Sequence, residues 1–275
     1  MRILIAHNRY RPTAPSGENA VVDQEADLLA TAGHAVDLFQ RHSAEISDWS
    51  PFRRAALPAQ VLWSGESKRL LSDALRAFRP DVVHVHNTFP LMSPSILYAC
   101  RDASTPVVAT IHNYRHACAN GEFYRDGRIC HDCVEKSSVP ALRHGCYRES
   151  HLSTIPVVLG TRMHAEAWRS LVSAHIFISE AQRSLLSSVG IPAERSFVKH
   201  NFVPRPTLES AEPVHRIAYV GRIDHAKGAG FLMHAWDDFI GQNPDTSLQL
   251  AIAGGGSLSE EVSSWAATRP SVSML

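Results

Sequence analysis

The chain has 275 residues, 44% of them hydrophobic and 20% charged, which suits about two packed domains. Its 27 basic and 27 acidic residues give a formal net charge of zero, so no basic excess points to nucleic acid as a partner. The start, MRILIAHNRY, lacks the apolar segment of a signal peptide, and no apolar run reaches the ~18 residues needed to cross a bilayer. These features predict a cytoplasmic protein, with docking on a membrane surface left open.

The first part of the chain alternates apolar strands with helices. A strand at 3–6 is followed by a loop with two prolines, a helix at 20–32 and a second strand at 36–39. This order, with Gly17 just before the helix, is the Rossmann-like pattern, although the GxGxxG fingerprint is missing. A glycine before a helix also serves as a simple turn or cap, so Gly17 alone is a weak signal. Residues 43–63 show no readable pattern and are expected to be irregular.

Two buried strands each end in a histidine. An amphipathic helix at 67–78 precedes the run DVVHVH at 81–86, and the run TPVVATIH at 105–112 repeats the design. The carboxyl ends of parallel strands meet at the sheet edge that faces the ligand crevice. One such histidine is more often a core or cap residue, but His86 and His112 delivered to the same edge favour a binding site.

The middle of the chain predicts the end of one domain and a hinge. A helix over 151–174 carries an apolar stripe that we interpret as core, and a strand at 175–178 follows it. Prolines and polar residues over 204–212 are typical of a linker. We therefore expect a parallel-sheet domain over 1–205, with helices on both faces, and a second domain over 213–275.

The stretch 215–239, HRIAYVGRIDHAKGAGFLMHAWDDF, combines a strand at 217–220, a glycine-containing turn and a helix from 227 to 241. Such a unit presents backbone N–H groups and a helix dipole to an anion. Its turn carries Arg222, a planar fork for phosphate oxygens, and Lys227, a mobile point charge. A diphosphate would suit this pair, whereas two solvated loop charges are the alternative that the residues alone leave open.

These motifs in order, MRIL, DVVHVH, TIHN and VGRI…KG, resemble the retaining glycosyltransferases of family four, which have the GT-B fold, along essentially the whole chain. The resemblance implies an α/β protein with a complete N-terminal Rossmann-like parallel-sheet domain and a partial second Rossmann-like domain. It implies that Arg222 and Lys227 bind the phosphates of a sugar nucleotide and that Gly17 lies in a loop reaching towards this donor. By the same resemblance His112 lies beside the donor sugar as the catalytic candidate, and His86 has a role nearby.

A loop over 115–150 contains most of the cysteines. They are Cys118, Cys130, Cys133 and Cys146. The loop has few large aliphatic residues, so a tetrahedral zinc site with four thiolates would supply the stability that a core cannot. Reduced free thiols and disulfides are the alternatives, and a cytosolic compartment disfavours disulfides. A similar loop occurs in a subset of the family, and Cys100 is expected to be buried filler.

The resemblance also indicates what the sequence lacks. Family members continue beyond the turn Gly254-Gly255-Gly256 with a pair of glutamates that grips the donor sugar and ribose, and with a C-terminal helix. This sequence stops in the strand that begins near 271, so we expect a truncated copy with an uncovered sheet edge.

Taken together, the residues and the resemblance predict a glycosyltransferase that moves a sugar from a nucleotide-diphosphate donor to a hydroxyl of a glycan or lipid-linked acceptor. Polysaccharide or glycoconjugate synthesis, in the cytoplasm or at the inner face of the membrane, is the expected setting. Catalysis would require no cofactor, because the cations of the turn stabilise the leaving diphosphate without a metal. Two alternatives stay open: a truncated, inactive fragment that binds a nucleotide or a partner, and a GT-B sugar-nucleotide epimerase.

Overall fold

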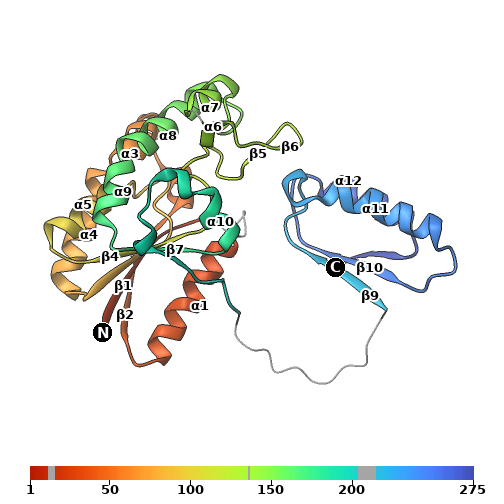
Figure 1. Ribbon diagram of the computed structural model, residues 1–275, viewed down its shortest axis with the longest axis horizontal. Coiled ribbons are helices and arrows are strands. Elements are labelled where there is room, and N and C mark those ends of the chain that lie inside the picture. The colour runs from red at the N-terminus through yellow and green to blue at the C-terminus, as the bar shows by residue number, and fades with distance from the viewer. Residues whose placement is uncertain (12–15, 136, 204–214) are drawn as a thin grey trace. The chain divides into compact units, whose positions relative to one another are not determined.

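The chain forms two compact units in a computed structural model (Figure 1). The structure describes residues 1–11, 16–135, 137–203 and 215–275. The first unit comprises Met1–Phe123 and Cys130–Arg205, and the second comprises Tyr124–Ile129 and Pro206–Leu275. The hinge expected over 204–212 lies outside the described residues. No helix in the described ranges is long and apolar enough to cross a membrane.

The first unit is built on a six-stranded parallel sheet in the order β2-β1-β3-β4-β7-β8, which confirms the predicted parallel architecture. The strands are β1 (Arg2–Arg9), β2 (Ala35–His42), β3 (Val82–Val85), β4 (Val107–Ile111), β7 (Ala174–Phe177) and β8 (Ser196–Val198). Its central strands are buried on both faces, which explains why they are near-continuous apolar runs in the sequence.

Helices cover both faces of this sheet (Figure 1). The main ones are α1 (Gly17–Thr31), α4 (Gly65–Phe78), α5 (Ser95–Asp102), α8 (His151–Met163), α9 (Ala165–Leu171) and α10 (Glu180–Leu185). Successive side chains of β1 point to opposite faces. Ile3 and Ile5 therefore pack with Val22 of α1, whereas Leu4 and Ala6 belong to the core formed with α4, α5 and α9.

Two segments differ from the sequence-based expectation. Residues 43–63 contain short helices instead of irregular chain, namely η1 (Ser43–Asp48), α2 (Pro51–Ala55) and α3 (Leu57–Leu62). These helices are too short to give a periodic pattern. The single helix expected over 151–174 is divided at His164, whose Nε2 lies 2.7 Å from the carbonyl oxygen of Leu62. That tertiary contact joins residues far apart in the sequence, so no local periodicity reveals it.

The cysteine-bearing loop contains little regular structure. Its elements are the antiparallel strands β5 (Tyr124–Arg125) and β6 (Arg128–Ile129) and the short helices α6 (Asp132–Glu135) and α7 (Val139–His144). Two 3-10 helices, η2 (Ser187–Val189) and η3 (Ala193–Arg195), follow α10 further along the chain. None of the five cysteines, all of them among the described residues, forms a disulfide, and Cys100 is fully buried in α5, as expected for a core residue.

The second unit contains a three-stranded parallel sheet in the order β11-β10-β9. Its elements are β9 (Arg216–Val220), η4 (His225–Lys227), α11 (Ala229–Gln242), β10 (Gln249–Ala253), α12 (Ser259–Ala267) and β11 (Val272–Met274). Trp236 of α11 and Val262 of α12 pack with Leu250 and Ile252 of β10. The helix expected from residue 227 begins two residues later, because Gly228 has a φ of +75° and ends a 3-10 turn first.

Candidate functional site

Histidines gather where three neighbouring strands of the first unit end. They are His7 of β1, His84 and His86 at the end of β3, and His112 after β4. Nδ1 of His86 lies 2.9 Å from Nε2 of His112, and the two rings stack with centroids 5.1 Å apart. The structure thus brings together the two histidines that the sequence placed at one sheet edge.

Burial keeps these imidazoles neutral at physiological pH. Loss of solvent lowers the pKa of His7, His84 and His112 to about 4, and it lowers the pKa of His86 well below its ordinary value. A neutral imidazole has one N–H donor and one lone pair. His86 and His112 can therefore share one hydrogen bond in which one ring donates and the other accepts.

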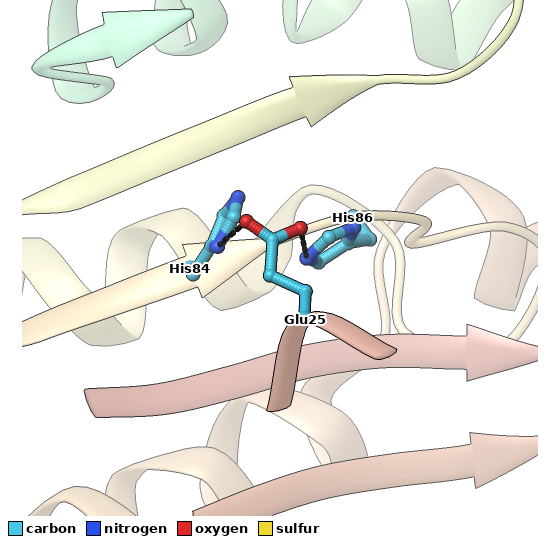
Figure 2. Close-up of side chains that lie close together, drawn as sticks. All are labelled: Glu25, His84 and His86. Carbon is cyan, nitrogen blue, oxygen red and sulfur yellow. Dashed lines mark ion pairs between the residues drawn. The ribbon is translucent and has the colours of Figure 1, made fainter. Parts of the chain in front are cut away.

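Glu25 of α1 points into this cluster (Figure 2). Its Oε1 lies 3.7 Å from Nδ1 of His84 and its Oε2 lies 3.8 Å from Nε2 of His86, so the three side chains could hold one metal ion. Nζ of Lys199 is 3.3 Å from Oε1, and burial raises the pKa of the carboxyl against the opposing effect of this ammonium group. The sequence pattern did not single out Glu25; the one signal was its place three residues after the apolar Val22, on the same face of the helix.

The start of α1 lies beside the loop that follows His112. Gly17 is the first residue of α1, and a Cβ there would meet no atom within 4 Å in the described chain. The next residue, Glu18, is mostly withdrawn from solvent, and its Oε1 accepts a hydrogen bond of 3.1 Å from Nδ2 of Asn113. Burial raises the pKa of Glu18. Side chains that the sequence did not single out therefore tie the predicted Gly17 loop to the predicted His112 loop.

A hollow of about 100 Å³ opens next to the paired histidines. Its wall includes His86, His112, Phe89, Arg115 and Trp168. The guanidinium of Arg115 lies 4.4 Å from the centre of the Phe89 ring. The hollow thus joins apolar and aromatic surface to hydrogen-bonding groups, the mixture that small-ligand sites commonly show.

The second unit contains the two predicted cations in the turn after β9. Arg222 and Lys227 are both exposed, and Nε of Arg222 lies 3.3 Å from Oδ2 of Asp224. Oδ1 of Asp224 accepts a hydrogen bond of 2.9 Å from the backbone N–H of Lys227, and the Tyr219 hydroxyl donates to the carbonyl of Arg222 at 2.7 Å. The backbone of the turn is therefore fixed from both sides while the two cationic side chains face solvent.

The glycines after β10 allow a second loop to lie against this turn. The backbone N–H of Gly221 donates to Ala253 at 3.0 Å, and the N–H of Ile223 donates to Gly255 at 3.0 Å. A Cβ on Gly254 would lie 1.9 Å from the carbonyl oxygen of Gly221, so a side chain is excluded there. The glycine run thus has a structural cause that the sequence motif alone did not reveal.

The cysteines of the loop at 115–150 lie within electrostatic reach of one another. Burial raises the pKa of Cys133 to about 11, and repulsion from Cys118, Cys146 and Cys130 adds to the shift. The zinc site itself stays a prediction.

Comparison of this chain with solved structures identifies its fold. The chain aligns over 100% of its length with 67% of a lipopolysaccharide outer core galactosyltransferase, WaaB, at 14% identity and a TM-score of 0.51. It aligns likewise with 68% of HepE from Anabaena in complex with UDP-glucose, at 14% identity and a TM-score of 0.57. A UDP-GlcNAc 2-epimerase from Methanocaldococcus jannaschii is matched over 73% of its chain, at 9% identity and a TM-score of 0.50. The architecture is the GT-B fold.

The sequence then identifies the family. Residues 15–205, more than half of the chain, match the family model of Glycosyltransferase Family 4. The chain belongs to glycosyltransferase family 4. No curated protein matches the sequence.

Proposed function

We propose that the protein is a retaining glycosyltransferase that moves a sugar from a nucleotide-diphosphate donor to a hydroxyl acceptor. The observation that supports this most directly is the partly buried His86–His112 pair at the carboxyl edge of the sheet, within the residues that match family 4. Polysaccharide or glycoconjugate synthesis is the proposed setting, with a glycan or lipid-linked acceptor met in the cytoplasm or at the inner face of the membrane.

The proposed role of Arg222 and Lys227 is to stabilise the leaving diphosphate. Negative charge gathers on this group as the bond to the sugar breaks, and fixed cations lower the energy of the transition state. The exposed side chains on a fixed turn support the assignment. A charged hydrogen bond is worth roughly 1.5–3 kcal/mol, so loss of one cation should slow transfer by about ten- to 150-fold.

The proposed role of His112 is to contact the donor sugar, with His86 holding its ring in place. His112 adjoins both the hollow and, through Asn113 and Glu18, the Gly17 loop. We assign the hollow to part of the acceptor, since it offers aromatic surface and hydrogen-bonding groups beside His112. Gly17 would leave room for the donor at the start of α1.

The test is a single-turnover assay with a panel of sugar nucleotides, beginning with UDP-glucose, the ligand in the HepE structure. Lys227→Ala should slow transfer by about ten- to 150-fold. The matched control is Arg216→Ala, which removes an exposed cation from the opposite end of β9 and should leave transfer unchanged. His112→Ala should impair transfer more than donor affinity. Unchanged turnover and affinity in Lys227→Ala would refute the phosphate assignment.

The same panel of donors, tested with and without an acceptor, separates the transferase from an epimerase and from an inactive fragment. An epimerase would release epimerised sugar or sugar nucleotide without any acceptor, whereas an inactive fragment would show thermal stabilisation by a nucleotide and no turnover with any donor. The anomeric configuration of the product, measured by NMR, tests retention. Inversion would overturn the retaining mechanism and leave the transferase assignment in place.

For the cysteine-bearing loop we propose a structural zinc ion bound by Cys118, Cys130, Cys133 and Cys146. The electrostatic coupling of Cys133 to Cys118, Cys130 and Cys146 supports this proposal, because it shows that the four sulfur ligands lie near one another and Zn²⁺ binds such a set as thiolates. The ion would stabilise the loop and take no part in transfer.

A further inference from the structure

Glu25 and His84 have no part in the transfer reaction proposed above, yet they form a buried cluster with His86. The exposed fractions of Glu25, His84 and His86 are 7%, 6% and 6%. His84 lies in β3 and His86 directly follows the strand, two positions later, so both side chains face the same side of the sheet. Glu25 reaches them from α1, with each carboxylate oxygen facing one ring nitrogen (Figure 2).

The separations in this cluster suit ligands of a shared ion better than hydrogen bonds. The two oxygen–nitrogen distances are 3.7 and 3.8 Å, whereas hydrogen bonds to nitrogen or oxygen span roughly 2.7–3.2 Å. Ligands about 2.0–2.2 Å from a tetrahedral ion lie about 3.3–3.6 Å apart. The ligand atoms of the three side chains all lie within 4.8 Å of one another, so a small inward movement would place them around one ion. Oε2 of Glu25 and Nε2 of His86 have no hydrogen-bond partner among the described residues. A cation between them would supply the missing interaction.

In both His84 and His86, the outer ring nitrogen, meaning the one that points away from Glu25, already has a hydrogen-bonding neighbour. Nε2 of His84 lies 2.8 Å from Oγ1 of Thr110, and Nδ1 of His86 lies 2.9 Å from Nε2 of His112. Metal-binding histidines have this arrangement, in which a hydrogen bond at one nitrogen aims the lone pair of the other at the ion. When the outer nitrogens donate, both inner lone pairs face Glu25.

We propose that Glu25, His84 and His86 bind a divalent transition-metal cation such as Zn²⁺. Two imidazoles and one carboxylate are a common ligand set for such ions and leave a position open. The ammonium group of Lys199, 3.3 Å from Oε1 of Glu25, competes with the ion. Its side chain is 38% exposed and can turn into solvent when the ion binds. The ion would affect His112 without touching it. A metal on Nε2 of His86 makes the Nδ1–H of that ring a stronger donor in the hydrogen bond that His112 accepts.

The test is a titration of metal-free protein with Co²⁺, followed by absorption spectroscopy. Cobalt bound by the cysteine loop gives thiolate charge-transfer bands, whereas cobalt bound by nitrogen and oxygen ligands does not. We expect the Glu25 site to bind one equivalent of Co²⁺ without these bands, in addition to any cobalt that the cysteine loop binds with them, and we expect Zn²⁺ to displace it. Glu25→Gln should weaken this binding by more than about 100-fold, and Thr110→Val, which removes only the partner of His84, by about 10–100-fold.

Two further variants control this experiment. His175→Gln changes a buried histidine of β7 outside the cluster and should bind Co²⁺ like the wild type, whereas Lys199→Met should bind it more tightly. Circular dichroism checks that each variant is folded. If Glu25→Gln is unfolded, the affinity of Thr110→Val for Co²⁺ alone tests the site. Cobalt bound only through thiolates, or equal affinity in wild type and Thr110→Val, would overturn the site. Metal binding is measured without donor, so failure of the proposed transfer reaction would leave this result unaffected.

Discussion

Replacing Gly254 by alanine should unfold much of the second unit. Gly254 has a φ of +146°, and its added Cβ would lie 1.9 Å from the carbonyl oxygen and 2.9 Å from the carbonyl carbon of Gly221. Both are backbone atoms, so no side chain can rotate away to relieve the overlap. The turn that contains Arg222 and the loop after β10 would have to separate by about 1 Å at least.

The loss of stability expected for Gly254→Ala is the sum of two costs. A residue forced into a backbone region that only glycine favours costs of order 1–3 kcal/mol. Forcing extra atoms into a packed region costs about 1–3 kcal/mol more, so the total loss is about 2–6 kcal/mol. Stability of roughly 0.05–0.15 kcal/mol per residue gives a unit of about 60 residues only about 3–9 kcal/mol. The substitution should therefore remove a large share of the stability of this unit.

The assay is hydrogen exchange measured by mass spectrometry on peptides from 215–275, with peptides from the first unit as an internal reference. Gly255→Ala is the matched control, because a Cβ at Gly255 would meet no atom within 4 Å in the described chain. We expect exchange in the second unit to accelerate strongly in Gly254→Ala and hardly at all in Gly255→Ala. Equal protection in the two variants would refute the close packing of the two loops.

Three other predictions concern separate parts of the molecule. Cys130→Ser should remove about one equivalent of zinc and lower the unfolding temperature more than Cys100→Ser, and zinc-free wild type measured by elemental analysis would contradict this. Two hydrogen bonds of 2.7 Å from Arg9 lower the pKa of Asp23, so this pair stabilises the fold above the unfolded pKa of about 3.9 and loses its effect as the pH falls through the lowered folded value. In urea unfolding, Asp23→Asn should therefore cost about 0.2–1 kcal/mol at pH 7 and almost nothing once the pH has fallen below the lowered folded pKa of Asp23. An equal cost at neutral and at acidic pH would contradict the pairing. Tyr219→Phe removes the hydrogen bond to the carbonyl of Arg222 and should weaken binding of the donor nucleotide by about five- to tenfold in calorimetry, whereas unchanged affinity would show that this bond does not position the turn.

The sequence by itself determined the main elements of both sheets. Buried parallel strands are short apolar runs and covering helices are amphipathic, and both patterns depend only on local spacing. The strands expected at 81–86 and 105–112 accordingly match β3 and β4 closely. The edge shared by His86 and His112 was predictable for the same reason, since neighbouring parallel strands end on the same side.

Only the tertiary structure decided which side chains join these histidines. Glu25 is 59 positions before His84 in the sequence, and their contact depends on β1 lying beside β3 with α1 packed on one face. Neither condition follows from the pattern of apolar residues, because that pattern fixes which face of an element is buried and not which neighbour covers it. The division of the 151–174 helix at His164 has the same origin, since Leu62 supplies the contact.

The glycines after β10 also show what the sequence predicts and what only the structure reveals. Their sequence motif predicted a turn, because glycine is compatible with unusual backbone angles. Only the structure shows that Gly254 and Gly256 are required by the backbone of the preceding turn, at Gly221 and Ile223, whereas Gly255 meets nothing within 4 Å in the described chain. Local chemistry thus determined where the chain turns, and the close approach of two loops far apart in the sequence determined which glycines the fold needs.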